Sequence, residues 1–112
     1  MWVANYGGNT VTELNAATGA LVKVITGFEY AAYGPGEISS DGTHVWVTNA
    51  ASVTELNAAT GALVKVISGS RYGFNGLTGV SSDGTHVWVA NYIGDSVTEL
   101  NAATGALVKV IT

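Results

Sequence analysis

The chain has 112 residues, enough for one domain, and it combines 47% apolar residues and 15 glycines with only 11% charged residues, a composition typical of tightly turned β-structure. Its net charge of −4 argues against nucleic acid and acidic membrane surfaces as partners, because phosphate binding needs clustered Lys and Arg. The absence of cysteine excludes disulfides and thiolate chemistry, no apolar run approaches the roughly 18 residues of a membrane span, and the amino terminus lacks the layout of a signal peptide.

Two phrases recur along the chain. The phrase VTELNAATGALVKVI occurs unchanged at 11–25, 53–67 and 97–111, and SSDGTHVWVTN at 39–49 returns as SSDGTHVWVAN at 81–91. The copies therefore start 42 and 44 residues apart, and a period of this length without helix signals is the size of one propeller blade. We divide the single partial propeller domain 1–112 into the repeat units 1–36, 37–78 and 79–112.

The first unit is incomplete. Residues 1–5, MWVAN, align with 45–49, VWVTN, so this unit begins inside the second strand of the repeat and lacks the innermost strand. Its remaining strands fall within the shared fifteen-residue phrase. We expect three strands in the first unit and four in each of the others.

The third unit shows a complete repeat of four short strands, at 79–82, 86–91, 97–101 and 107–111. An Asp-Gly turn at 83–84 joins the first two strands, because this dipeptide accepts the positive φ of a tight hairpin. In the turn before the last strand, the side chain of Asn101 can bond the backbone and Gly105 can take the left-handed conformation.

The strands at 86–91 and 107–111 are apolar on both faces, so the sheet must be covered on both sides. Stacked identical blades cover one another, which predicts an all-β fold of four-stranded antiparallel meanders, the blades of a β-propeller. About three blades are expected, the first without its innermost strand. The alternative is a β-solenoid, whose coils are usually shorter and whose strands are parallel.

The run SSDGTHVWVTN followed by SVTELNAATGALVKVI resembles the YVTN-type β-propeller repeat over essentially the whole chain. The matching positions of the middle repeat are Asp41, Gly42, Asn49, Asn57, Thr60 and Gly61, with counterparts in the third repeat. Trp46 and Trp88 stand where Tyr is commoner, and Asn57 stands where Asp is commoner. The resemblance implies a propeller, often extracellular or at the cell surface, with no single activity and no catalytic residue to carry over.

Three blades are too few for a closed ring, because propellers have about 4–8 blades. An open wedge would expose two apolar blade faces, which drive association. We therefore expect either further blades in a longer chain or self-association, and a homodimer that builds a six-bladed ring is favoured.

The differences between the copies collect in the loops at one rim of the predicted ring, which makes this rim the best candidate binding site. The candidate ligand residues are Tyr6, Tyr30, Tyr33, Arg71, Tyr72, Phe74, Asn75, Tyr92 and Asp95. Aromatic faces beside a few polar groups suit a glycan, a peptide or a protein. The competing interpretation is that Phe28, Tyr30, Tyr72 and Phe74 fill gaps between adjacent blades.

Other chemistry-bearing residues have structural interpretations. Ser, Asp and His lie close together in SSDGTH, but they are neighbours on one hairpin and occur twice, which favours turn hydrogen bonding over a catalytic triad. His44 and His86 lack the neighbouring ligands of a metal site, so no metal or cofactor is expected. The repeated tryptophan is expected to anchor blade packing. Whether Glu and Lys of the last two strands face one another depends on a register that the sequence leaves open.

The leading functional hypothesis is a non-catalytic propeller module that serves as a scaffold or recognition surface. One alternative is an enzyme with an active site at the ring axis, for which Glu37 and Arg71 are the charged candidates found in a single repeat. The other is a purely structural or engineered repeat protein with no ligand.

Overall fold

The computed structural model describes residues 1–5, 7–8, 10–26, 35–49 and 51–112. These residues form eleven strands in three antiparallel sheets, of three, four and four strands, and one turn of 3-10 helix, Ser70–Tyr72. The predicted all-β fold is therefore confirmed, and among the described residues the first blade has the three strands expected of it.

Each sheet is a meander of consecutive strands. The first blade comprises β1 (Trp2–Asn5), β2 (Thr10–Leu14) and β3 (Leu21–Ile25). The second comprises β4 (Ile38–Ser40), β5 (His44–Thr48), β6 (Val53–Asn57) and β7 (Leu63–Ile67). The third comprises β8 (Leu77–Ser82), β9 (His86–Asn91), β10 (Ser96–Asn101) and β11 (Leu107–Ile111). Strand β8 begins before the predicted 79–82, because Leu77 already pairs with Asn91 across an irregularity in the ladder.

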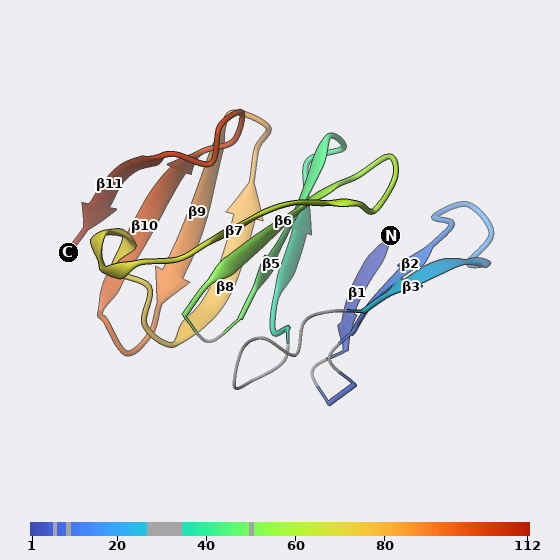
Figure 1. Ribbon diagram of the computed structural model, residues 1–112, viewed down its shortest axis with the longest axis horizontal. Coiled ribbons are helices and arrows are strands. Elements are labelled where there is room, and N and C mark those ends of the chain that lie inside the picture. The colour runs from blue at the N-terminus through green and yellow to red at the C-terminus, as the bar shows by residue number, and fades with distance from the viewer. Residues whose placement is uncertain (6, 9, 27–34, 50) are drawn as a thin grey trace.

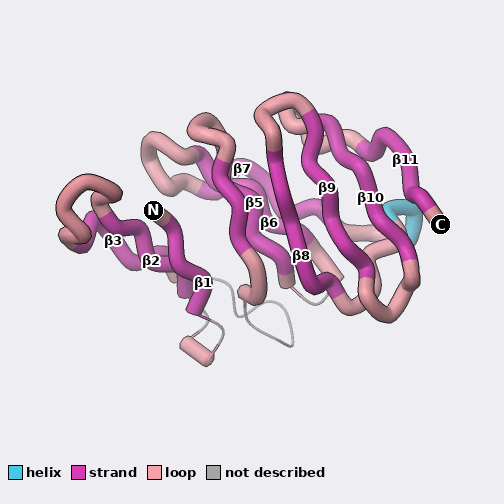
Figure 2. The backbone as a smooth tube through the Cα atoms, turned by 180° about the vertical axis from the view of Figure 1, so that it is seen from behind, coloured by secondary structure: helices cyan, strands magenta, loops and turns pink. Residues whose placement is uncertain are grey.

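The three blades stand side by side in chain order, with the N-terminus in the first blade and the C-terminus at the far edge of the third (Figure 1). Figure 2 shows the same order from behind. The innermost strands β1, β4 and β8 are neighbours, so the outermost strands β3, β7 and β11 lie on the opposite side of each blade.

The invariant turns are held by side chains of their own repeat. Asp41 Oδ1 accepts the amide N–H groups of Thr43 and His44 at 2.9 and 2.8 Å. Asn57 Oδ1 likewise accepts those of Ala59 and Thr60 at 2.8 and 3.1 Å. The third blade repeats both arrangements. These local bonds explain why SDGT and NAATG recur unchanged.

Alternation along the strands gives every blade two apolar faces. The rear face of the second blade carries Val45, Val47 and Leu56, which pack with Trp2, Val11 and Ile25 of the first blade. Its forward face carries Trp46, Val53 and Ile67, which pack with Val87, Val89 and Leu100 of the third blade. We use forward face and rear face for the equivalent positions of every blade. Trp2 and Trp46 are thus blade anchors, as predicted, and Trp46 is fully buried.

Candidate recognition site

In the third blade, the described loop between β9 and β10 and the one that leads into β8 lie at the end of the blade opposite the invariant turns (Figure 1). The loops at this end include those between β9 and β10 and between β7 and β8. The predicted candidates Tyr6, Tyr30 and Tyr33, together with Phe28, lie outside the described residues. The site can therefore be followed on the third blade, through residues 69–76 and 92–95.

Tyr72 and Phe74 fill the space between the second and third blades. The side chain of Tyr72 is buried in the shared core, and its ring stacks on Phe74 with centroids 5.3 Å apart. The backbone carbonyl of Tyr72 accepts a hydrogen bond from Thr98 Oγ1 at 2.6 Å. The gap-filling interpretation is confirmed for these two aromatic residues.

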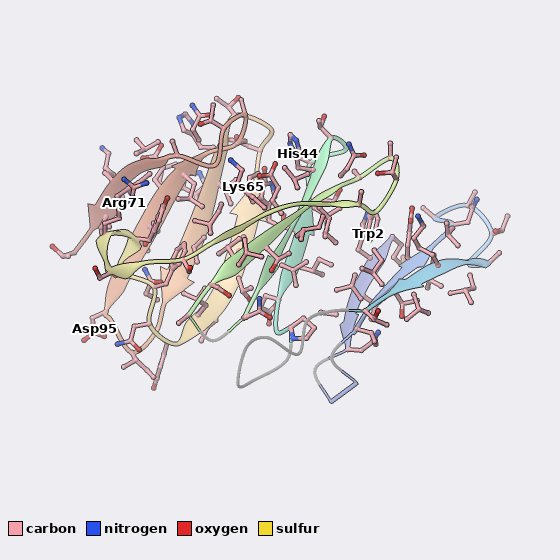
Figure 3. All side chains as sticks on the ribbon, in the orientation of Figure 1. Trp2, His44, Lys65, Arg71 and Asp95 are labelled. Atoms are coloured by element: carbon pink, nitrogen blue, oxygen red, sulfur yellow. The ribbon has the colours of Figure 1, made fainter. Side chains whose placement is uncertain are left out.

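Arg71 packs against Tyr72 of this core and lies away from the end of the blade that carries the variable loops. Its guanidinium carbon lies 4.9 Å from the centroid of the Tyr72 ring, and Nη2 donates a hydrogen bond to Tyr72 Oη at 2.9 Å. The 3-10 turn that carries Arg71 contacts the outer strand β11. Figure 3 shows Arg71 beside this strand and Asp95 at the end of the β9–β10 loop, so the structure does not bring the two predicted charges together.

The loop after β9 closes onto the loop before β8. The Tyr92 amide donates to the carbonyl of Gly76 at 3.0 Å, and the Gly94 amide donates to the carbonyl of Asn75 at 3.4 Å. Ile93 occupies the space that a side chain at Gly76 would need, with Cγ1 only 2.6 Å from the position of a Cβ there. These contacts fix the two loops against each other before any ligand arrives.

Two apolar side chains project from this fixed support. Tyr92 is 74% exposed and Ile93 is 66% exposed. Asp95 and Asn75 are exposed beside them, and Asp95 has a φ of 51°, a conformation that Asp tolerates better than most residues. We define Asn75, Tyr92, Ile93 and Asp95 as the rim patch. Sequence reasoning missed Ile93, although an isoleucine in this loop occurs in only one repeat.

The asparagine that ends the second strand of each repeat ties that strand to the third. Asn91 Nδ2 donates to Ser96 Oγ at 3.1 Å and to Thr98 Oγ1 at 2.9 Å. Asn5 and Asn49 make the equivalent pairs of bonds in their blades. These bonds hold the base of each variable loop, so the residues at its tip can differ without loss of the blade.

Ser, Asp and His of SSDGTH do not form a relay. Ser82 Oγ donates to Asp41 Oδ2 of the preceding blade at 2.8 Å. His44 Nε2 instead lies 3.2 Å from Glu55 Oε2 on the adjacent strand, and His86 and Glu99 repeat this pair at 3.3 Å. The amide bonds from His86 and Thr85 hold the pKa of Asp83 below its ordinary value of 3.8. Asp41 and Asp83 act in turn hydrogen bonding, as the sequence predicted, whereas the histidines pair with glutamates of the adjacent strand.

The glutamate of the third strand and the lysine of the outermost strand are opposite each other in register in every blade, but Lys23 and Lys65 bond to the next blade. Glu55 is opposite Lys65, yet Lys65 Nζ donates to the carbonyl of Thr104 in the next blade at 2.5 Å. Burial raises the pKa of Glu55 above its ordinary value of 4.5, against the opposing effects of His44 and Lys65. The His–Glu pair and the contact of lysine with the next blade were not visible in the sequence.

Within the described part of the chain, no group of three or more His, Cys, Asp or Glu side chains could hold a metal ion. No helix among these residues is long and apolar enough to cross a membrane.

No protein-family model matches the chain, and no curated protein matches it either. Solved structures do resemble it. Hydrazine synthase of Kuenenia stuttgartiensis matches 99% of this chain with a TM-score of 0.80 and 19% identity, over 32% of its own length. The RRP9 WD40 repeats match 98% of the chain with a TM-score of 0.79 and 13% identity, over 34% of their length. A nidogen/laminin complex chain matches 98% with a TM-score of 0.72 and 14% identity, over 41% of its length.

The fold is therefore that of β-propeller blades. At these identities the likeness concerns the fold alone. The chain spans about a third of the length of the first two of these structures, at 32% and 34%.

Proposed function

We propose that this chain is a non-catalytic β-propeller module of the YVTN type, extracellular or at the cell surface, that presents the rim patch for recognition and completes its ring by self-association. The observation that carries the recognition role is the exposure of Tyr92 and Ile93, at 74% and 66%, on loops that the backbone bonds of Asn75 and Gly76 hold in place. Binding to such a fixed surface loses little conformational entropy.

The rim patch suits a protein or peptide partner best. Tyr92 and Ile93 offer a mixed aromatic and aliphatic contact, and Asp95 adds a carboxylate that favours a basic side chain in the partner. A glycan would use mainly the face of Tyr92, so it is the second candidate class.

A scaffold role without catalysis agrees with the geometry of the polar residues. Asp41 and Ser82 are engaged in turn and blade contacts, and the histidines face glutamates in the same repeat position. Of the two candidates for an axial active site, Arg71 lies by the outer strand β11, so its position gives the enzyme alternative no support.

The recognition role is tested by selecting binders from a peptide display library on immobilised protein. Tyr92→Ala and Ile93→Ser should each weaken a selected peptide at least tenfold, because they remove the exposed contact while leaving the backbone bonds in place. Thr60→Ala, at an exposed turn of the opposite end, is the control and should bind as the parent does. Peptides that bind all variants equally would exclude the rim patch, and selective binding of glycans would replace the peptide class.

Self-association is proposed because the end blades leave apolar faces uncovered. Trp46 is fully buried in the second blade, while the equivalent Trp88 of the third blade is 37% exposed. Sedimentation of the isolated 11.4 kDa chain should show a discrete species of twice this mass, a six-bladed ring. A stable monomer at all concentrations would exclude it.

A further inference from the structure

The two junctions between blades are the same contact made twice. Lys23 of β3 donates from Nζ to the carbonyl of Thr60, in the turn between β6 and β7. Lys65 of β7 donates in the same way to the carbonyl of Thr104, in the turn between β10 and β11. The outer strand of each blade therefore caps a turn of the blade that follows it, and Figure 3 shows Lys65 directed toward the third blade.

An isoleucine and a glycine complete this junction. Ile25 Cδ1 lies 3.1 Å from where a Cβ of Gly61 would stand, and Ile67 Cδ1 lies 3.1 Å from the same position at Gly105. Both glycines are buried. A Cβ at this turn position would therefore lie closer to the preceding blade than an ordinary van der Waals contact.

The two ends of the chain carry the separate halves of this same junction. On the forward face of the third blade, Trp88, Val97 and Ile111 are 37%, 36% and 44% exposed. Their counterparts Trp46, Val53 and Ile67 are 0%, 0% and 4% exposed under the next blade.

The rear face of the first blade shows the complementary half. Val3 is 40% exposed, whereas the equivalent Val47 and Val89 are fully buried. Gly19 is exposed, and no atom lies within 4 Å of the Cβ position that Ile25 and Ile67 crowd at the other two glycines.

We propose that the forward face of the third blade docks on the rear face of the first blade of a second copy. In this junction the Lys109 amine donates to the Thr18 carbonyl, Ile111 packs on Gly19, and Trp88 covers Val3. The inference deepens the proposed self-association and rests on it.

A second copy is the occupant that the sequence itself specifies. The turn of the first blade, NAATG at 15–19, is identical to the turns at 57–61 and 101–105 that receive Lys23 and Lys65. Lys109 and Ile111 repeat the residues that cap those turns. Two copies related by a two-fold axis make this junction twice, so the association closes on itself.

Because the chain contains no cysteine, the junction can be tested by directed cross-linking of the full chain. The double variant Thr18→Cys/Lys109→Cys, treated with a short bis-maleimide, should give a covalent dimer on a denaturing gel. The control Thr104→Cys/Lys65→Cys uses the internal junction, where the carbonyl and Nζ are 2.5 Å apart, and should give an intrachain link with the mass of one chain.

The outcomes separate this junction from self-association in general. A sedimenting dimer that fails to cross-link, while the control does link, would overturn the junction and leave self-association standing. A covalent dimer from Lys109→Cys alone would mean that two forward faces meet, which also overturns it. A chain that sediments as a monomer and does not cross-link would overturn both the junction and the proposed self-association. Gly19→Asn, which keeps a residue tolerant of positive φ, should weaken the dimer at least tenfold if the junction is correct.

Discussion

The hydroxyl of Ser82, at the end of β8, donates a hydrogen bond to Asp41 Oδ2 at 2.8 Å and so joins this strand to the turn after β4 of the neighbouring blade. The Ser82 amide adds a bond to Ser39 Oγ at 3.1 Å. Burial alone would raise the pKa of Asp41, but the hydrogen bonds from the His44 amide, the Ser82 hydroxyl and the Thr43 amide outweigh it and hold this pKa below 3.8. Asp41 therefore stabilises the fold in its charged form.

Ser82→Ala should lower the free energy of unfolding at neutral pH by about 1 kcal/mol, since it removes a hydrogen bond to a charged group. Ser40→Ala is the matched control, because both serines accept the amide of a turn glycine at 3.3 Å and only Ser82 also donates to Asp41. Chemical denaturation gives the difference. Equal losses in the two variants would mean that the bond between the blades contributes nothing.

The same pair predicts a response to acid. A carboxylate with a lowered folded-state pKa contributes stability above its ordinary pKa, here 3.8, and loses that contribution as the pH falls through the lower value. In Ser82→Ala the pKa of Asp41 should move up, so this loss should begin at higher pH. An NMR titration of the Asp41 carboxyl measures the change, and an unmoved pKa would contradict it.

Trp46→Ala should lower the free energy of unfolding by about 3–5 kcal/mol, as expected for a fully buried aromatic side chain. Trp88→Ala, at the same repeat position but 37% exposed, should cost less when measured on dilute protein. Urea denaturation of both variants tests this. Similar losses in the two would show that the burial difference between the blades has no energetic effect.

Gly61→Ala should be more destabilising than Gly19→Ala. Both glycines have a φ of 75°, so alanine pays the left-handed penalty of about 1–2 kcal/mol at either position. Only at Gly61 does the new Cβ also meet Ile25 Cδ1 at 3.1 Å, which adds about 1 kcal/mol or more. Thermal unfolding of the dilute proteins compares them, and equal melting temperatures would count against the close blade junction.

Glu55→Gln should show a gain in stability that grows with pH. Burial raises the pKa of Glu55 in the folded state above 4.5. The protonated side chain therefore contributes stability below pH 4.5, and this contribution is lost as the pH rises through the folded-state pKa. The free energy of unfolding of the variant, measured relative to that of the parent protein, should therefore be higher at about pH 8 than at about pH 4. A difference between variant and parent that is the same at both pH values would contradict the prediction.

Strand positions and turns could be predicted because they depend on interactions within one repeat. Asp41 and Asn57 bond amides two and three residues away, so the sequence pattern alone indicates these turns. The alternation of Trp46 between two valines likewise indicates a strand covered on both faces.

Contacts between repeats could not be predicted from the sequence in the same way. Lys65 reaches the carbonyl of Thr104, and Ser82 reaches Asp41 across the blade junction. In a set of identical repeats, the sequence does not show whether a lysine bonds its own blade or the next. The aromatic loop residues had the same ambiguity, since only the loop path buries Tyr72 and leaves Tyr92 in solvent.

The position of the second blade, covered on both its rear and its forward face, has a kinetic consequence. In an array whose units contact only their neighbours, the terminal units open first because each is held from one side. Amide hydrogens of β5 and β6 should then exchange more slowly than those of the equivalent strands in the first and third blades. Closure of two chains into a ring would leave no terminal unit, and this gradient of exchange along the chain would largely disappear.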